Sequence, residues 1–435
     1  LLTGKVMDDQ NTGLIGSLRG AVKRLGEPVI RTAVGRAMKE MGRQFVLGET
    51  ITSAMKRAEG MEKKGYTYSY DMLGEAAKTD ADAMRYHLAY SRAITAIATA
   101  CTNKDSRDNP GISVKLSALH PRYEVAQRDR VMEELVPRLR SLALLAKSAG
   151  MGLNIDAEEA DRLAISMDVI ETVLSEPALT GWDGFGVVVQ AYGKRAGATL
   201  DFLYELSEKL DRKIMVRLVK GAYWDTEVKR AQVEGIDGFP VFTNKAATDV
   251  SYIANARKLL SMTDRIYPQF ATHNAHTVAA ILHMADDKST FEFQRLHGMG
   301  EALHDIVLKD QGTRCRIYAP VGAHRDLLAY LVRRLLENGA NSSFVNQIVD
   351  EDVPAEAVAS DPFDQVQSTE GVLPRGPELY APERVNSKGF DLTDLPTLNA
   401  MDTARELYRN TQWHAVPLLA VKAAPNSAQS VNNPF

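Results

Sequence analysis

Cysteine is nearly absent from this chain: Cys101 and Cys315 are the only two in 435 residues. Two cysteines can form neither a disulfide framework nor a thiolate metal cluster, and this scarcity favours a reducing compartment. No apolar run approaches the ~18 residues that a transmembrane helix requires, and no secretory signal is recognisable. The net charge of −4 gives no indication of nucleic-acid binding. The remaining composition, 45% hydrophobic and 25% charged, is ordinary for a soluble globular protein.

Several catalytic motifs are missing as well. No Gly-x-Gly-x-x-Gly opens a helix after the first predicted strand, and no Walker phosphate loop is present. His273 and His276 are the closest suggestive metal-binding pair, but no third ligand accompanies them, so we predict no metal site. A Ser-His-Asp triad has no support, because the Gly-x-Ser-x-Gly elbow is absent.

What the sequence does contain is a regular alternation of β-rich runs and helical patterns. The predicted strands cover residues 66–73, 112–116, 153–157, 185–190, 214–219, 266–273, 291–296 and 315–320. The predicted helices cover residues 81–101, 128–148, 163–174, 200–210, 247–262, 277–284, 301–308 and 327–338. Eight such pairs fit the size of a (β/α)8 TIM-like barrel, and a doubly wound open sheet is the main alternative.

The flanks of this pattern differ from it. We predict a helical segment over residues 1–60, a barrel over 61–350 and an irregular tail or linker over 351–435, where prolines interrupt regular structure. The first segment is basic, and a basic amphipathic helix can lie on a membrane surface. Packing on the main domain is the simpler interpretation. Because the chain begins with Leu rather than Met, we expect a piece of a longer polypeptide.

The stretch at residues 214–225 organises the chain. Its first half reads as a buried strand, yet Arg217 and Lys220 interrupt the apolar run, and a buried cation is costly unless it meets an anion or a polar cavity. Gly221-Ala222 then lets the backbone approach a ligand closely. This pattern indicates the floor of a site, although an ion pair with a neighbouring strand would also account for it.

In a barrel, functional side chains collect at the carboxyl ends of the strands. The polar residues at or just beyond these ends are Asp71, Glu75, Lys115, Asp156, Glu158, Glu159, Gln190, Arg217, Lys220, Thr272, His273, Arg295, His297 and Tyr318. Each one alone has a simpler interpretation: Lys115 as a surface lysine, for example, and Asp156 as a structural partner of Arg217. Their shared position is what predicts a site.

The last predicted helix adds a second signal. Tyr330, Arg333, Arg334 and Glu337 are spaced to share one face. Two adjacent guanidinium groups suit a carboxylate, which arginine can hold through two hydrogen bonds. A solvated polar face is the alternative interpretation.

Five motifs in order carry a family resemblance: Arg217 to Trp224, Ala271 to Asn274, Gln294 to Met299, Tyr318 to Gly322 and Tyr330 to Glu337. Together they resemble the proline dehydrogenase family, most closely the proline dehydrogenase part of the bacterial bifunctional proline utilisation A proteins. The resemblance runs from about residue 60 to 350 and is weaker on both sides.

This resemblance implies oxidation of L-proline to pyrroline-5-carboxylate, with noncovalent FAD as hydride acceptor and a membrane quinone as the next electron acceptor. The catalytic residues that it implies are Lys115, Asp156, Arg217 and Tyr318. The implied substrate contacts are Glu75, Lys115, Tyr223, Tyr318, Tyr330, Arg333 and Arg334. The implied cofactor contacts are Asp156, Gln190, Arg217, Lys220, Gly221, Ala222, Trp224, Thr243, Thr272, His273 and Glu337.

The resemblance also implies a setting: a downstream glutamate-semialdehyde dehydrogenase domain, homo-oligomers of the full-length protein, and a cytoplasmic location at the inner membrane. We predict no nucleic-acid contact from this segment. Two other functions stay open. One is a lyase or aldolase that uses Lys115 or Lys220 as a Schiff base. The other is a non-catalytic membrane or regulatory module that uses the basic residues between 19 and 43.

Overall fold

The computed structural model describes residues 45–323, 330, 333, 354, 359–366 and 373–413. The chain forms two compact units, residues 1–390 and residues 391–435, which are described separately here. The predicted boundaries near residues 60 and 350 stay predictions.

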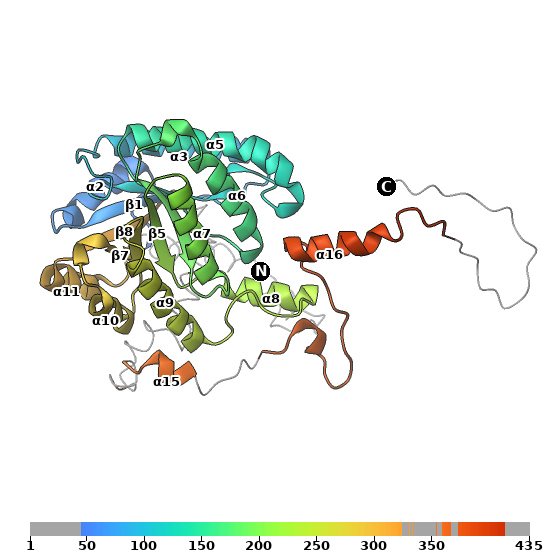
Figure 1. Ribbon diagram of the computed structural model, residues 1–435. Coiled ribbons are helices and arrows are strands. Elements are labelled where there is room, and N and C mark those ends of the chain that lie inside the picture. Colours follow the sequence, from blue (N-terminus) through green and yellow to red (C-terminus); the bar gives the residue numbers. More distant parts are fainter. Residues whose placement is uncertain are drawn as a thin grey trace, which may run out of the picture. The chain divides into compact units, whose positions relative to one another are not determined.

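Eight parallel strands close into a barrel in the first unit, each strand pairing with the next and β8 pairing with β1 (Figure 1). The strands are β1 (Thr67–Met72), β2 (Gly111–Val114), β3 (Leu153–Ile155), β4 (Phe185–Gln190), β5 (Ile214–Val219), β6 (Ile266–Ala271), β7 (Glu292–Leu296) and β8 (Arg314–Val321). In the closing pair, Ser69 lies opposite Tyr318. The prediction of a (β/α)8 TIM-like barrel is therefore confirmed.

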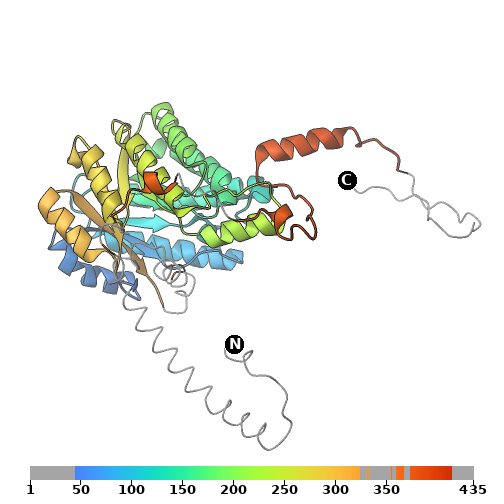
Figure 2. The same cartoon turned by 90° about the horizontal axis from the view of Figure 1, so that it is seen from below.

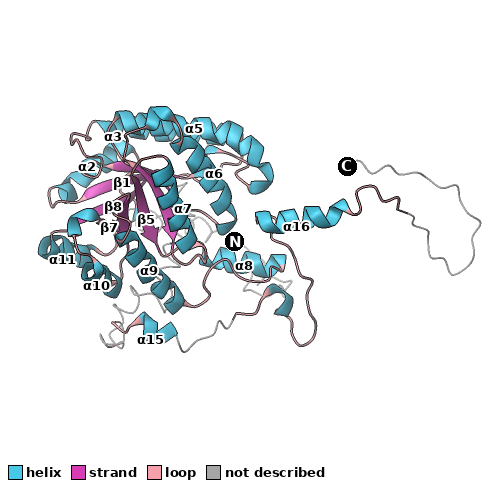
Figure 3. Ribbon diagram, in the orientation of Figure 1, coloured by secondary structure: helices cyan, strands magenta, loops and turns pink. Residues whose placement is uncertain are grey.

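Helices surround the strands (Figure 3), and they do so again in the view turned by 90° (Figure 2). They are α2 (Ile51–Glu62), α3 (Asp80–Ala98), α4 (Leu116–Leu119), α5 (Arg128–Ser148), α6 (Leu163–Leu174), α7 (Ala196–Lys209), α8 (Trp224–Glu234), α9 (Lys245–Leu260), α10 (Ala275–Met284) and α11 (Glu301–Gln311). No described helix combines the length and apolarity that crossing a bilayer requires.

Local sequence explains where these helices begin and end. Thr79 and Asp82 form a capping box that satisfies backbone donors at the start of α3. Asn244 caps α9 by accepting a hydrogen bond from the Ala246 backbone N–H. Gly235 ends α8 in the left-handed conformation, with φ of 68°, which glycine adopts without steric cost.

The main hydrophobic core lies between the sheet and the helices, where Leu135 and Leu139 of α5 are fully buried. The inside of the barrel is different. Side chains of Ser69, Ser113 and Arg217, from three strands, meet there through hydrogen bonds of 3.1–3.2 Å. Barrels are usually filled by branched apolar side chains, so this interior is polar for its fold and already indicates a use other than packing.

Two features differ from the predicted pattern. The sequence pattern predicts only one helix between β5 and β6, whereas α8 precedes α9 there. Most of the predicted last helix, residues 327–338, lies outside the described residues, but Tyr330 and Arg333 are helical.

After the barrel, two short helices, α15 (Pro362–Val366) and η6 (Gly376–Glu378), belong to the first unit. The chain beside η6 contacts the end of α8: the Gly389 N–H donates to the Gly235 carbonyl at 2.9 Å, and the Gln232 side chain donates to the Pro374 carbonyl at 2.9 Å. In the second unit, α16 (Leu395–Glu406) is the described helix, capped by Asp394.

Candidate functional site

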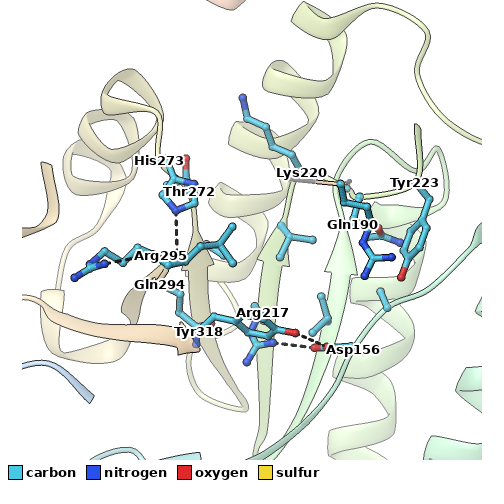
Figure 4. Close-up of a pocket in the computed structure, with 18 of the residues that line it drawn as sticks. Asp156, Gln190, Arg217, Lys220, Tyr223, Thr272, His273, Gln294, Arg295 and Tyr318 are labelled. Atoms are coloured by element: carbon cyan, nitrogen blue, oxygen red, sulfur yellow. Dashed lines mark hydrogen bonds and ion pairs between the residues drawn. The ribbon is translucent and has the colours of Figure 1, made fainter. Parts of the chain in front are cut away.

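A cavity of about 300 Å3 opens at the carboxyl ends of the strands. Residues from β4 to β8 contribute to its wall, together with Lys115, Tyr330 and Arg333 (Figure 4). The predicted site residues that line it are Lys115, Asp156, Gln190, Arg217, Lys220, Gly221, Ala222, Tyr223, Thr272, His273, Tyr318, Tyr330 and Arg333. Segments far apart in the sequence thus meet at one place, where the strand-end rule had placed them.

Lys115 lies just past β2 and is held by three polar partners. Its Nζ lies 2.7 Å from an Asp71 oxygen, 3.0 Å from Asp156 and 3.3 Å from the Tyr318 hydroxyl. Burial alone would lower the pKa of Lys115, but the neighbouring Asp71, Tyr318 and Asp156 side chains, two of them carboxyl groups, raise it well above the usual value. Lys115 is therefore held as an ammonium ion at neutral pH.

Asp156 connects Lys115 with Arg217. One oxygen of Asp156 accepts from Arg217 Nη1 at 3.0 Å, and the other accepts from the Tyr318 hydroxyl at 2.9 Å (Figure 4). The Arg217 guanidinium also lies 5.2 Å from the centre of the Tyr318 ring. Its Nε–H has no hydrogen-bond partner among the described residues, although it is buried. Arg217 is thus anchored by Asp156 and still has a donor available for a ligand.

Arg333 lines the cavity and forms an ion pair with Glu75. Its Nη1 and Nη2 donate to the two Glu75 oxygens at 2.7 and 2.8 Å, and its guanidinium lies 5.4 Å from the centre of the Tyr223 ring. Burial would raise the pKa of Glu75, but the hydrogen bonds and charge of Arg333 outweigh burial and lower it. A guanidinium has five N–H donors, so the two bonds to Glu75 leave donors for another carboxylate.

Gln190 joins the end of β4 to the start of α8. Its side-chain nitrogen donates to the Glu158 carbonyl at 2.9 Å, and its oxygen accepts from the Ala222 N–H at 3.1 Å. Gly221 beside it has a φ of 145°, and an added Cβ would collide with the Tyr192 ring. Only glycine lets the backbone take this course along the cavity wall.

The far side of the cavity carries two lysines and a histidine. Lys220 pairs with Asp249, and Lys245 lies 3.9 Å from the same carboxylate. His273 Nε2 accepts a hydrogen bond from the Leu296 backbone N–H at 3.0 Å, which fixes the ring beside Thr272 (Figure 4). Both cations and donors are therefore available along this wall.

Seven of the predicted residues do not line the cavity in the described part of the chain, and two more cannot be placed. The seven are Asp71, Glu75, Glu158, Glu159, Trp224, Thr243 and His297. Glu75 lies behind Arg333, as described. Trp224 is 37% exposed and donates from its indole to the Phe242 carbonyl at 2.9 Å, which brings it close to Thr243 in the chain, also outside the lining. Arg334 and Glu337 lie outside the described residues.

His297, which the strand-end rule singled out together with Asp71, Glu158 and Glu159, is one of these seven. It does not line the cavity, and its Nε2 is buried without a hydrogen-bond partner among the described residues. Burial, together with the charges of Arg57 and Arg295, lowers its pKa to about 4. His297 is therefore neutral at physiological pH.

Several lining residues are not among the predicted ones, namely Ala157, Val188, Val219, Lys245, Ala271, Asn274, Gln294 and Leu296. Among these, Gln294 is the most informative, because its oxygen is buried without a partner among the described residues. Its position two residues before the end of β7 was the available signal. Arg295 also lines the cavity, but its guanidinium points away from the other labelled side chains (Figure 4) and lies 5.0 Å from the centre of the Tyr66 ring.

The described residues contain no group of three His, Cys, Asp or Glu side chains that could hold a metal ion. The fold and the site together define a (β/α)8 barrel protein with a cation-rich ligand cavity at the carboxyl ends of its strands. A family model described as "Proline dehydrogenase" matches residues 54–347. The chain belongs to the proline dehydrogenase family.

Known proteins resemble the chain closely. It is 50% identical over 453 aligned residues to the bifunctional protein PutA of Salmonella typhimurium, covering all of this chain and 34% of that protein. It is 27% identical to proline dehydrogenase 1 of Bacillus subtilis, covering 70% of this chain and 88% of that protein. A crystal structure of Bradyrhizobium japonicum proline utilisation A (PutA) has a TM-score of 0.80 at 54% identity, covering 92% of this chain and 42% of that one. The chain thus spans about a third of the PutA relative's length.

A second family model, described as the DNA-binding domain of proline dehydrogenase, matches residues 1–45. Residues 1–44 lie outside the described part of the chain. The prediction that this segment makes no contact with nucleic acid therefore finds no support in the comparisons and stays untested.

Proposed function

We propose that this chain oxidises L-proline to pyrroline-5-carboxylate and uses noncovalent FAD as the hydride acceptor. The observation that carries the proposal is one cavity lined by both Arg333 and Arg217. Arg333 suits the substrate carboxylate, and Arg217 suits negative charge that develops on a reduced cofactor. Membership of the proline dehydrogenase family supports the same reaction.

The substrate would be oriented by charge at one end and by packing around its ring. Arg333 has five N–H donors, of which two bind Glu75, and Lys115, which also lines the cavity, supplies a second positive charge. Tyr223, Tyr318 and Tyr330 offer ring surfaces between them. The closure of Glu75 on Arg333 would exclude water from the bound substrate, as lids do in many enzymes.

The cavity floor fits a flavin on two grounds. The buried Arg217 Nε–H and the Gln294 side-chain oxygen lack partners among the described residues, so they offer one donor and one acceptor to a heteroaromatic ring. Gly221 lets the backbone pass without a side chain in the way. We propose that Arg217, Gln190, Lys220, Thr272 and His273 hold the cofactor, together with Trp224, Thr243 and Glu337. When bound, FAD accepts a hydride from the ring carbon next to the substrate nitrogen.

Arg217 would stabilise the reduced state, because a fixed cation favours negative charge that appears next to it. Asp156 holds that guanidinium in place. Lys115 is not suited to remove the substrate nitrogen's proton, because its raised pKa keeps it protonated. The amine therefore has to enter the reaction without its extra proton, or lose that proton to water.

The ion pairs of Lys115 and Lys220 argue against a Schiff-base enzyme. A lysine must be neutral to attack a carbonyl, whereas Lys115 is held charged by two carboxylates and Lys220 is paired with Asp249. Stable trapping of a carbonyl compound on either lysine by borohydride would revive this alternative.

The wider setting is also proposed. The PutA relatives are much longer than this chain, which supports a downstream glutamate-semialdehyde dehydrogenase domain. We further propose that electrons pass to a membrane quinone, and that the full-length protein forms homo-oligomers at the cytoplasmic face of the inner membrane.

The match over residues 1–45 favours DNA binding as a second function over our prediction of no contact. An electrophoretic mobility shift of duplex DNA, with a chain lacking residues 1–45 as control, decides that point.

The visible spectrum of the pure protein, before and after anaerobic addition of proline, tests the main proposal. We expect flavin absorption bands that bleach with proline and stay unchanged with an amino acid lacking the ring, such as alanine. A colourless protein that binds no added FAD, or a flavoprotein that proline does not reduce, would contradict it.

A further inference from the structure

Glu227, in the first turns of α8, is a buried carboxyl group outside the cavity. Its side chain is 3% exposed, and one oxygen accepts the Ala160 backbone N–H at 2.6 Å. Its own N–H donates to the Tyr223 carbonyl at 2.9 Å. Ala160 belongs to residues 156–162 after β3, here called the β3 loop. Glu227 therefore joins this loop to Tyr223, the cavity-lining residue that immediately precedes α8.

The connection closes into a ring. The Ala222 N–H donates to Gln190, and Gln190 donates to the Glu158 carbonyl, two residues before Ala160. Following the contacts from Ala222 leads through Gln190 and the β3 loop to Glu227, and then back along α8. The three side-chain contacts measure 3.1, 2.9 and 2.6 Å, and the last of them is made by Glu227. Gln190, Ala222 and Tyr223 line the cavity, so the ring borders the site.

Two further contacts hold the same turn of the β3 loop. Arg230, one helical turn after Glu227, forms an ion pair with Asp161. Arg195, at the start of α7, donates to the Ala160 carbonyl at 2.6 Å. The backbone N–H and the backbone carbonyl of Ala160 therefore both have partners. Glu227 alone among these side chains binds its N–H and is itself buried.

Packing does not explain why this position holds a carboxyl group. Val228 and Ala231 already bury the apolar side of α8. Burial raises the pKa of Glu227 to about 7, opposed by the Ala160 N–H and Arg230 and assisted by Asp161 and Glu159. An apolar residue would avoid this cost, but it would leave the Ala160 N–H without its acceptor. The carboxyl group therefore serves the geometry of the loop.

We propose that Glu227 is a positioning residue that fixes Tyr223 and Gln190 on the cavity wall, acting through α8 and the β3 loop. The inference rests on the proposed function, since Tyr223 is there a packing surface for proline and the partner of Arg333. Glu227 lines no part of the cavity. Its effect is to keep Tyr223 and Gln190 in their positions on the cavity wall.

The test compares Glu227→Ala with Glu227→Gln and with Asp225→Ala, an exposed acid of the same helix. Glu227→Ala is expected to raise KM for proline about tenfold, the size of a lost hydrogen bond to a buried group, with kcat changed less than about twofold. Glu227→Gln keeps an acceptor oxygen and is expected to restore KM to within about twofold of the parent. Asp225→Ala is expected to match the parent. Should Glu227→Ala not fold, Glu227→Asp, which withdraws the acceptor by one methylene, replaces it and is expected to show a smaller rise.

Hydrogen–deuterium exchange separates this inference from the proposed function. In Glu227→Ala, exchange is expected to quicken at residues 157–163 and 221–227 together, and in Asp225→Ala at neither. This readout holds even if the parent protein proves unable to oxidise proline, which would refute the proposed function alone. An unchanged KM in Glu227→Ala, a Gln variant that restores nothing, or unchanged exchange in both segments would overturn the positioning role.

Discussion

Two buried ionic clusters lie in the same barrel and differ in how completely their hydrogen bonds are satisfied. The first, here called the inner cluster, centres on Glu292 and Arg316. Glu292 accepts from Arg316 at 2.8 and 3.2 Å, from Gln269 at 2.9 Å and from Gln294 at 2.7 Å. The remaining Arg316 bonds go to backbone carbonyls at 2.7–3.2 Å. None of the Glu292 or Arg316 donors and acceptors is left without a partner among the described residues.

The second, here called the cavity cluster, contains Lys115, Asp156, Arg217 and Tyr318. It also consists of short contacts between buried groups, yet the Arg217 Nε–H has no partner within the described chain. The difference teaches how to separate structure from function in a charged barrel. A saturated ion pair such as Glu292–Arg316 has nothing left to offer a ligand. A group beside the cavity that lacks a partner among the described residues, such as the Arg217 Nε–H or the Gln294 oxygen, has.

The largest expected effect comes from breaking the inner cluster. Arg316→Met leaves Glu292 without a cation and several carbonyls without donors. Removal of one partner of a buried pair costs about 3–5 kcal/mol of folding free energy. Arg217→Met should cost less, because Asp156 keeps Lys115 as a partner. Urea denaturation of both variants measures the difference, and equal losses would remove the distinction between the two clusters.

The next largest effect is expected at Arg333, which lines the cavity. Arg333→Met removes the proposed carboxylate ligand, and loss of a buried charged hydrogen bond costs about 2–4 kcal/mol of binding. KM for proline should rise sharply while flavin stays bound and the unfolding midpoint changes little. Arg85→Met, an exposed arginine on α3 paired with Asp82, is the matched control. Steady-state rates identical to the parent in Arg333→Met would remove this residue from the substrate site.

A smaller effect is expected from Glu75, which contacts Arg333 but lines no part of the cavity. Glu75→Ala should raise KM by less than Arg333→Met, and Glu75→Gln should fall between, because an amide oxygen still accepts one hydrogen bond. The lowered pKa of Glu75 means that the pair is intact at neutral pH and is lost only as pH falls through that lowered value. Proline binding should therefore show no Glu75 titration in the neutral range, and a substrate-bound structure with these side chains apart would contradict the closure.

Much of this arrangement could be predicted from the sequence, because the strands are short β-rich runs that alternate with helical patterns, and parallel strands place the residues that follow them at one end. Lys115, Asp156 and Tyr318 were found in this way. What failed was α8: only Glu227, Val228 and Ala231 of its residues are buried, so its apolar pattern is too sparse to indicate a helix. Contacts that depend on α8, including those of Tyr223 and Gln190, were invisible for the same reason.

The two arginines show a second limit. Arg217 and Arg316 both interrupt apolar strands, and sequence alone offers no way to tell that one is saturated and the other is not. The choice between a ligand contact and an ion pair with Asp156 was left open for Arg217. The structure shows the ion pair, and it shows the spare donor as well. Whether every hydrogen-bonding atom of an arginine has a partner depends on which groups of other strands lie within hydrogen-bond distance. Only the closed barrel determines which groups these are.

The flavin potential of Arg217→Met tests the central claim most directly. The claim is that the spare donor and charge of Arg217 stabilise a reduced cofactor, so the potential should fall when the cation is removed. A loss of about 1–2 kcal/mol corresponds to a few tens of millivolts, since ~30 mV equals about 1.4 kcal/mol for a two-electron couple. Potentiometric titration of the parent and the variant at matched flavin occupancy makes the comparison. A variant that is less stable but has the parent's potential would show that Arg217 only joins β5 to Asp156, and would contradict the account.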